Sequence, residues 1–365
     1  MSGRRTTLYP QHIAAGARMV DFAGWDMPQQ YGSVRDEQHA VRTAAGLFDV
    51  SHMGRFEVRG GDGASLLQSV LTGDVEALEE GRALYSLMCR DDGGIVDDLV
   101  VYRRPGGWSV VVNAANRRKD LDWLVAHAAP GVDVADRSEE TSLLALQGPA
   151  AERQLAAAGA DATALPHFGI AEMTVAGVPC VVSRTGYTGE DGFEVFVPAG
   201  RSADVWAALV AAGACPCGLA ARDVCRLEAA LRLYGSDMDE LTNPYEVGLG
   251  WTVRLDKGEF VGRAALQRVK QEGRRRQLIG LVGGERTIPR HGAAVRLGGR
   301  TIGAVTSGTY SFWLGKGIGL ALVDSDAAPV GTEVTIALRN GDGTAEVVRL
   351  PFYRSAGRAA ARSIG

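Results

Sequence analysis

Short apolar runs separated by glycine, proline and aspartate alternate with amphipathic stretches along residues 1–267. Strict alternation of apolar and polar positions favours a strand, whereas apolar residues three or four apart favour a helix. Helices are expected over residues 63–71, 116–128, 203–212 and 219–233. Strands are expected over residues 55–58, 84–88, 95–102, 108–113, 143–146, 172–175, 180–183 and 192–197. Three of these strands follow one another through Asp/Gly and Pro/Gly turns, which predicts an antiparallel meander in an α+β fold.

One of the predicted helices has a recognisable start. Asn116 is a good N-cap residue because its side chain can accept a hydrogen bond from the first turn. Leu121, Leu124 and Val125 would then form the apolar stripe that the helix over 116–128 buries.

The pattern changes after residues 268–276, where lysine and arginine crowd a polar segment. We expect a linker with solvated charge there, in preference to a phosphate site, because the chain as a whole is acidic. Short glycine-rich strands are then expected over residues 278–282, 294–297, 301–307, 318–323, 333–338 and 345–350. Such strands fit a small antiparallel β-barrel. The predicted domains are therefore residues 1–267 and a C-terminal barrel domain over residues 277–365.

Composition is that of an ordinary globular protein with a sizeable core, with 46% hydrophobic and 22% charged residues in a chain of 365. A net charge of −4 gives no general attraction to nucleic acid or to anionic membranes. No apolar stretch approaches the roughly 18 residues that a membrane span needs. The first residues, Met1-Ser2-Gly3-Arg4-Arg5, do not lead into the apolar core of a signal peptide. We therefore expect a cytoplasmic protein that binds neither nucleic acid nor membrane.

The cysteines and histidines do not predict a metal site. The cysteines are odd in number and scattered, which does not fit a disulfide framework. Cys215, Cys217 and Cys225 lie close together, but no histidine is near and the usual two-residue spacer is missing. Reduced, mostly buried thiols and no bound metal are expected. His52 is a lone histidine, for which a structural role is the simpler hypothesis.

Two adjacent carboxylates lie in the otherwise apolar strand over residues 95–102. Alternation along the strand sends Asp97 and Asp98 to opposite faces. At least one of them would be buried, where it needs a hydrogen-bond partner. Burial raises the pKa of such an acid unless a donor is supplied, so that it can exchange a proton near neutral pH. The alternative is a pair of strand-end aspartates bonded to turn amides.

Two further segments carry polar side chains of interest. The glycine-rich stretch 184–192 would let the backbone approach a ligand closely. Glu194 shares a strand face with Phe196, where a carboxylate could bind the edge of a flat heterocycle through adjacent N–H donors. The simpler interpretation is an exposed glutamate on an edge strand. Arg222 and Arg226 lie four residues apart on one helix face, where an arginine more commonly holds a structural carboxylate.

Taken together, these segments resemble the T-protein (aminomethyltransferase) family of the glycine cleavage system. The resemblance spans essentially the whole chain, and its motifs occur in the family's order. They are Val20–Trp25, Leu47–Met53, Asp92–Tyr102, Leu144–Pro149, Arg184–Gly192, Ala221–Ala229, Gly248–Trp251, Pro289–Gly292, Val305–Gly308 and Leu350–Tyr353.

The resemblance implies three lobes in a clover-leaf arrangement around a central channel that holds folate, with two intertwined α+β lobes over residues 1–267. It also implies an activity. An aminomethyl group would pass from the dihydrolipoyl arm of a lipoylated H-protein to tetrahydrofolate, with release of ammonia and formation of methylene-tetrahydrofolate.

The same resemblance implies roles for individual residues. Asp98 would be the catalytic acid beside the reactive folate nitrogens, Glu194 would hold the pterin edge, and Arg222 would lie in the binding pocket. Further contacts to folate or to the channel are expected from Tyr85, Tyr102, Asn113, Tyr187 and Trp251.

One segment departs from the family's pattern. Where the family places a Ser-Pro pair before Leu-Gly-Lys, this chain has Phe312 and Trp313. We expect the two aromatic residues to be altered core packing of the third lobe. The other hypothesis is that they reshape the channel mouth where the carrier arm enters. The chain would then be a T-protein-like, folate-dependent one-carbon (methyl or hydroxymethyl) transferase that acts on a small molecule, as in secondary metabolism.

Overall fold

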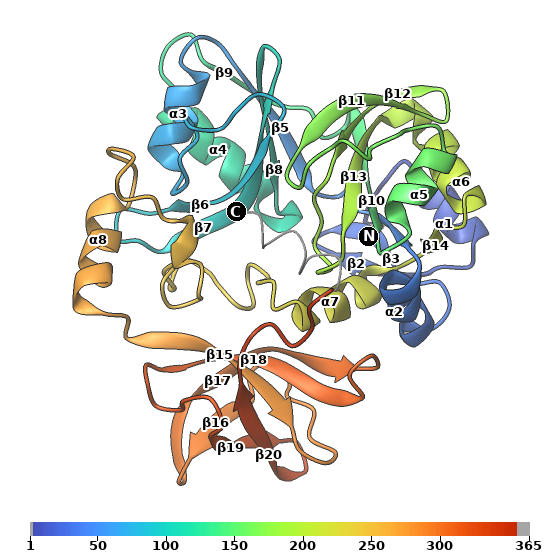
Figure 1. The fold of residues 1–365 in the computed structure, drawn as a ribbon. Coiled ribbons are helices and arrows are strands. Elements are labelled where there is room, and N and C mark those ends of the chain that lie inside the picture. Colours follow the sequence, from blue (N-terminus) through green and yellow to red (C-terminus); the bar gives the residue numbers. More distant parts are fainter. Residues whose placement is uncertain (1–2, 356–365) are drawn as a thin grey trace.

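The computed structural model of the chain describes residues 3–355, which form three lobes around a common centre (Figure 1). The first lobe is built on a five-stranded sheet of order β6-β7-β8-β5-β9, and the second on a six-stranded sheet of order β11-β12-β13-β10-β4-β14. The third lobe is a closed barrel of order β15-β18-β17-β16-β19-β20. The predicted α+β architecture with a C-terminal barrel is confirmed, whereas the central folate channel stays a prediction.

The first lobe contains the predicted meander, because β6, β7 and β8 pair antiparallel in sequence order. Its strands are β5 (Gly54–Arg59), β6 (Ala83–Cys89), β7 (Ile95–Arg104), β8 (Gly107–Val112) and β9 (Asp133–Asp136). Two helices, α3 (Gly63–Val70) and α4 (Arg117–His127), contribute to its apolar core.

Helix α4 differs from its prediction at two points. Asn116 does occupy the N-cap position, but its side chain makes no cap hydrogen bond and donates to Asp97 instead. Of the expected apolar stripe, Leu124 is fully buried, whereas Val125 is 53% exposed. The buried face of the helix is narrow, with Asp120 and Leu124 on it. Periodicity predicts a wider apolar stripe because apolar residues such as Val125 also occur on the exposed side.

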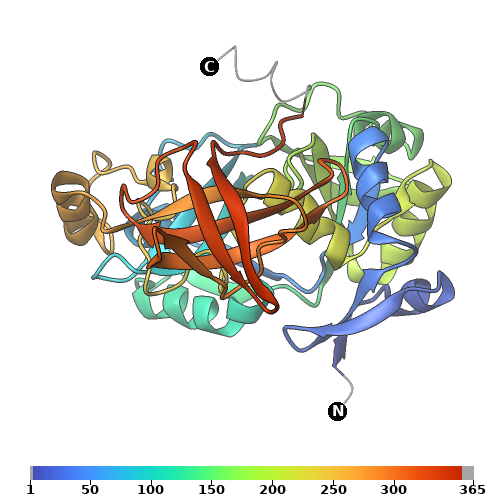
Figure 2. The ribbon, with the colours of Figure 1, turned by 90° about the horizontal axis from the view of Figure 1, so that it is seen from below.

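The second lobe is assembled from segments that flank the first lobe in sequence. Its strands are β4 (Gly46–Asp49), β10 (Thr141–Gln147), β11 (Ile170–Val175), β12 (Val178–Ser183), β13 (Gly192–Pro198) and β14 (Cys215–Pro216). Its helices are α1 (Tyr9–Ala14), α2 (Val34–Thr43), α5 (Ala151–Ala157), α6 (Ser202–Ala211) and α7 (Leu219–Glu228). A small sheet of β1 (Arg4–Arg5), β3 (Trp25–Gln30) and β2 (Arg18–Phe22) is formed by the N-terminal segment around α1, and its hairpin projects from the molecule in Figure 2.

Helix α7 ends at Glu228, earlier than the predicted Leu233. Ala230 has a φ of 54°, and its N–H donates to the carbonyl of Leu227 at 2.9 Å. The N–H of Leu231 donates back to Arg226 at 2.9 Å. This is a Schellman cap with alanine where glycine is usual. Because the apolar pattern continues beyond the cap, periodicity does not reveal the end of the helix.

The expected linker over residues 268–276 is mostly regular structure, so that prediction is wrong. Helix α8 (Arg263–Glu272) runs through its first half, and β15 begins at Arg276. Leu266 is fully buried and Ala265 nearly so, which anchors this otherwise charged helix. Only residues 273–275 connect the two elements.

All six strands expected in the barrel are present, and every neighbouring pair is antiparallel. They are β15 (Arg276–Gly283), β16 (Ala294–Leu297), β17 (Arg300–Ser311), β18 (Lys316–Asp324), β19 (Glu333–Leu338) and β20 (Gly341–Val348). The barrel docks on α7, since Arg226 donates to Ser307 Oγ at 2.9 Å and the Tyr353 N–H donates to the Glu228 carbonyl at 2.8 Å. The end of the predicted domain, residues 356–365, lies outside the described residues.

Candidate active site

Asp98 projects from β7 and keeps part of its surface exposed. Its Oδ2 accepts a hydrogen bond from the Tyr85 hydroxyl of β6 at 3.0 Å, and its Oδ1 accepts one from Asn113 Nδ2 at 2.7 Å. Burial, and to a smaller extent the charge of Asp97, raise the pKa of Asp98 to about 7 against the lowering effect of both donors. Asp98 can therefore take up or release a proton near neutral pH.

Asp97, on the other face of β7, is fully buried and well supplied with donors. It accepts hydrogen bonds from the Asn113 N–H at 3.2 Å, from Asn113 Nδ2 at 2.8 Å and from Asn116 Nδ2 at 2.7 Å. The two interpretations of the aspartate pair thus apply to different residues. Asp97 is the aspartate that accepts amide hydrogen bonds, and Asp98 is the one whose pKa is raised into the neutral range.

Tyr85 also connects Asp98 to an exposed aromatic surface. Its ring stacks on Trp251, with centroids 5.9 Å apart and planes inclined by 25°. Trp251 lies in a short 3₁₀ helix (Gly250–Thr252) and is 67% exposed. Burial raises the pKa of Tyr85, so its hydroxyl remains a hydrogen-bond donor at neutral pH. Tyr85 and Trp251 line one side of a pocket of about 320 Å³.

Glu194 is not an exposed edge-strand residue, so the simpler interpretation is wrong. Strand β13 is paired on both sides, where Glu194 lies opposite Ser183 and Ala145. The side chain is buried, and its Oε2 accepts hydrogen bonds from Thr185 Oγ1 at 2.5 Å and from the Tyr102 hydroxyl at 3.4 Å. Both of these hydrogen bonds go to Oε2, so the second carboxylate oxygen, Oε1, takes no part in them and can accept from a ligand.

Arg222 does not hold a structural carboxylate as the helix pattern suggests. Its guanidinium lies 4.8 Å from the ring centroid of Tyr187, and its Nη1 is buried without a hydrogen-bond partner in the described part of the chain. Burial lowers the pKa of Arg222, whereas the charge of Glu194 raises it. A buried N–H donor without an acceptor is costly, which is typical of a group that binds a ligand.

The expected structural pairing belongs to Arg226. It donates to Asp223 at 2.8 Å, to Asp237 at 2.6 Å and to Ser307 at 2.9 Å. On this face of α7, Arg226 therefore binds the barrel through Ser307, whereas Arg222 keeps its Nη1 without a partner within residues 3–355.

Every predicted site residue belongs to one connected set. Strand β7 carries Asp98 and Tyr102 on the same face, and Tyr102 reaches Glu194 across the interface between the first two lobes. Electrostatic interactions join Asp98 to Tyr187 and Glu194 to Arg222. The first and second lobes therefore each supply part of the site.

Three residues around this set are absent from the prediction. Thr185 bonds Glu194, Asn116 bonds Asp97, and Asp120 lies fully buried on α4. A sequence signal exists for Asp120, since it falls one turn before Leu124 on the buried stripe. Polar residues at such positions are common in helices, so the signal is weak.

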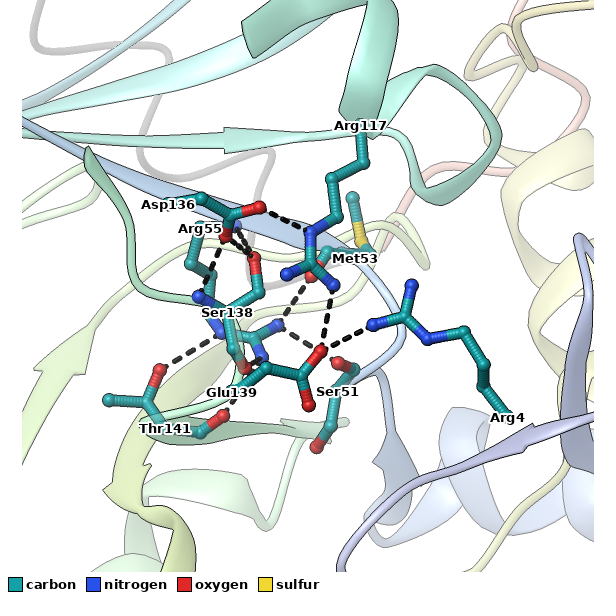
Figure 3. A network of polar contacts seen from close by, with 9 residues as sticks. All are labelled: Arg4, Ser51, Met53, Arg55, Arg117, Asp136, Ser138, Glu139 and Thr141. Carbon is teal, nitrogen blue, oxygen red and sulfur yellow. Dashed lines mark hydrogen bonds and ion pairs between the residues drawn. The ribbon is translucent and has the colours of Figure 1, made fainter. Parts of the chain in front are cut away.

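A polar network fixes the start of α4 and the segment that joins the first two lobes (Figure 3). Arg55 of β5 donates to the carbonyls of Ser51 at 3.0 Å and Thr141 at 2.8 Å, and also bonds the carbonyl of Ser138. Arg117, beside Asn116 in the chain, donates to Asp136 at 2.7 Å. These contacts hold the turn that presents Asn113 and Asn116 to Asp97.

The remaining histidine and cysteine candidates are mostly buried. His52 is buried with an edge-on contact to Phe22, and burial lowers its pKa to about 4, so the ring is neutral at pH 7. All five cysteines are free, and all but Cys215 are buried. Within residues 3–355 no group of three or more His, Cys, Asp or Glu side chains could hold a metal ion. No helix in that range is long and apolar enough to span a membrane.

Phe312 and Trp313 are not core residues, so the expectation of altered core packing is wrong. Both lie after β17, 45% and 41% exposed. The Trp313 ring contacts Tyr353 edge-on at 6.2 Å and His39 of α2 at 6.0 Å. Trp313 therefore lies on the surface where the barrel meets the second lobe, and Phe312 contacts Tyr310 of the barrel edge-on.

Comparisons with known proteins agree with this architecture. The sequence profile described as "GCVT N-terminal domain" matches residues 8–257, and the "Glycine cleavage T-protein C-terminal barrel domain" matches residues 276–354. The aminomethyltransferase of Geobacillus kaustophilus is 48% identical over 361 residues, covering 97% of this chain and 99% of that protein. That of Rubrobacter xylanophilus is 51% identical over 354 residues, covering 96% and 94%.

A solved structure is also similar over nearly its whole length. The crystal structure of glycine cleavage system aminomethyltransferase T from Bartonella henselae has a TM-score of 0.91 and 34% identity, covering 97% of this chain and 99% of that chain. The chain therefore belongs to the glycine cleavage T-protein family.

Proposed function

We propose that the protein is a tetrahydrofolate-dependent aminomethyltransferase of the glycine cleavage system. It transfers the one-carbon unit of aminomethyl-dihydrolipoyl H-protein to tetrahydrofolate, releases ammonia and yields methylene-tetrahydrofolate. Family membership supports the transferase class, and the relatives named aminomethyltransferase match it over nearly their full lengths. The observation that carries the proposal is Asp98, a partly exposed acid with a pKa of about 7 held by Tyr85 and Asn113.

The residues of the site fit a folate. Glu194 has an acceptor oxygen, Oε1, outside its hydrogen bonds to Thr185 and Tyr102, which suits the N–H groups of a pterin edge, and Arg222 has a buried donor without a partner in residues 3–355. Trp251 is exposed, Tyr85 is half-buried, and their stacked rings offer aromatic faces to a flat ring. Three further residues orient these groups, because Tyr102 bonds Glu194, Asn113 bonds Asp98 and the Tyr187 ring lies against Arg222.

Tetrahydrofolate supplies the nitrogen nucleophile that accepts the one-carbon unit. The carboxylate of Asp98 orients the attacking group and accepts its proton, and its raised pKa suits it for that exchange at neutral pH. The surrounding side chains hold donor and acceptor together and exclude water, which would otherwise capture the one-carbon unit.

The reverse reaction tests this function directly. The protein is mixed with methylene-tetrahydrofolate, ammonia and dihydrolipoyl H-protein, and the carrier is weighed by mass spectrometry. An aminomethyl-loaded H-protein is the expected result. Folate binding without loading would contradict it and would favour the alternative, a one-carbon transferase that acts on a small molecule.

A further inference from the structure

A third carboxyl group lies behind the aspartate pair of β7 and has no part in the proposed mechanism. Asp120 of α4 is fully buried, and neither of its oxygens has an N–H or hydroxyl donor within residues 3–355. Asp120 lies one turn after Asn116 at the start of α4, and the Asn116 side chain bonds Asp97 at 2.7 Å, so the carboxyl of Asp120 is on the helix face directed at Asp97. Two carboxylates in contact at a buried position cannot both be ionised, so Asp97 and Asp120 share one proton.

The donors around the two groups show where that proton resides. Asp97 accepts three hydrogen bonds from Asn113 and Asn116, which stabilise it as an anion. Asp120 accepts none from these amides. Burial raises the pKa of Asp120 well above its usual range, and the hydrogen bond to Asp97 and the charge of Asp97 raise it further. The proton therefore belongs to Asp120, whose O–H donates to Asp97.

Lys119 is the neighbouring cation that could instead ionise Asp120. Its charge does lower the pKa of Asp120, but less than burial and Asp97 raise it. The ammonium itself is directed elsewhere, to the carbonyl of Val96 at 2.7 Å, the hydroxyl of Tyr234 at 3.0 Å and Glu240 at 3.3 Å. The charge of Lys119 therefore does not stabilise an ionised Asp120 enough to remove the proton from it.

Other titratable groups face the three carboxyls from every side. They are Tyr85 on β6, Lys119 on α4, Tyr187 in the glycine-rich loop and Tyr234 after α7, while Arg232 interacts with Tyr85 and Tyr187. Burial raises the pKa of the three tyrosines, which are neutral at pH 7. The anion next to Asp98 is thus Asp97.

We propose that Asp120 is a positioning residue that remains protonated and, by donating a hydrogen bond to Asp97, keeps Asp97 ionised beside Asp98. The inference rests on Asp98 as the proton-exchanging group of the proposed function. Asp120 acts only through Asp97 and touches no substrate. Because of this hydrogen bond, Asp97 stays an anion through the working pH range. Its negative charge then continues to favour the protonated form of Asp98.

Infrared difference spectroscopy of the full chain tests the protonation state without any need for activity. The spectra are recorded at about pH 9, two units above the pKa of Asp98, so that Asp98 is ionised. We expect the carbonyl band of a protonated carboxylic acid in the wild type and in the Asp98→Asn variant, and its loss in Asp120→Asn. A wild-type spectrum without the band, or a band that survives in Asp120→Asn, overturns the proposal.

The pH dependence of turnover tests the effect on Asp98. Asp97→Asn removes the anion, so the acid limb of kcat moves to lower pH by about one unit. The amide of Asp120→Asn donates to Asp97 as the protonated acid does, so this variant keeps the acid limb of the wild type. Asp120→Ala lacks the donor, so Asp97 takes up a proton more easily and the limb moves in the same direction as in Asp97→Asn.

Two outcomes contradict the positioning role. A shift in Asp120→Asn as large as that in Asp97→Asn would mean that Asp120 is an anion in the wild type. A profile of Asp120→Ala identical to the wild type would leave Asp120 with a purely structural role. If the protein shows no aminomethyl transfer at all, the proposed function fails, and the infrared result still decides the protonation of Asp120.

Discussion

Neighbouring side chains give the two adjacent aspartates of β7 different chemistry. Asp97 receives three N–H donors and is enclosed, whereas Asp98 receives one amide and one hydroxyl donor and retains access to solvent. The strand pattern shows that one of the pair must be buried. It does not show which one, because Asn113 and Asn116 approach only after β8 and α4 have packed against the strand.

Replacement of Asp98 by asparagine should abolish most turnover while the fold and tetrahydrofolate binding persist. The amide keeps the shape but cannot take up a proton, and loss of a general base typically costs about 10²–10⁴-fold in rate. Turnover is measured in the reverse assay and folate binding by calorimetry. Asp91→Asn, an exposed carboxylate in the preceding turn, is the matched control and should behave as the wild type. Full activity of Asp98→Asn would refute the assigned role.

The acid limb of the kcat profile should lie near pH 7, because Asp98 must be ionised to accept a proton. Tyr85→Phe should move this limb to higher pH by about one unit. The hydroxyl of Tyr85 stabilises the carboxylate, so its removal raises the pKa of Asp98. Measurement of kcat across pH 5–10 checks the direction. A shift to lower pH would show that Tyr85 does not act through this hydrogen bond.

At the scale of single elements, α2 illustrates why periodicity misses part of the fold. Its buried face consists of Glu37, Gln38 and Arg42 together with Val41, so it carries almost no apolar stripe. A helix with polar residues inward is stabilised by partners that the local sequence does not contain. Glu37, for example, accepts hydrogen bonds from the backbone N–H groups of Tyr31 at 2.6 Å and Gly218 at 2.8 Å.

Arg42→Ala should destabilise the contact between α2 and α7 severely. The Arg42 guanidinium is fully buried and bonds Glu190 at 2.7 Å and Glu228 at 2.6 Å. Removal of one partner leaves buried charge without compensation, which costs about 3–5 kcal/mol. Arg118→Ala breaks an exposed pair with Asp122 on α4 and should have a far smaller effect, because water screens this pair. Urea unfolding of the two variants compares them, and equal losses would contradict the argument.

At the scale of the whole molecule, the order of the lobes and the barrel are accessible to sequence reasoning, because the barrel strands alternate regularly between glycine-rich turns. The site is less accessible. Asp98 and Glu194 lie far apart in sequence and are joined only when Tyr102 crosses the interface between two lobes. The resemblance to a family predicts both as site residues. Composition and spacing alone are also consistent with a turn-bonded aspartate and an exposed edge-strand glutamate.

Phe312→Ala and Phe193→Ala compare the loss of stability at a surface position with the loss at a core position. Phe312 is 45% exposed after β17, whereas Phe193 is fully buried in the second lobe. The first change should alter the free energy of unfolding by less than about 1 kcal/mol. The second should cost about 3–5 kcal/mol. Thermal and chemical unfolding measure both. A large loss in the free energy of unfolding of Phe312→Ala would show that the Phe312 side chain is part of the core.

The interleaved second lobe has a consequence for protein synthesis. Strand β4 leaves the ribosome roughly ninety residues before its partner β10, and all five strands of the first lobe are made in between. Pairing across so long a separation is slow, and an unpaired strand is a template for aggregation. The nascent chain can complete the first lobe before β10 is made, so β4 remains without this partner until residue 147 has emerged.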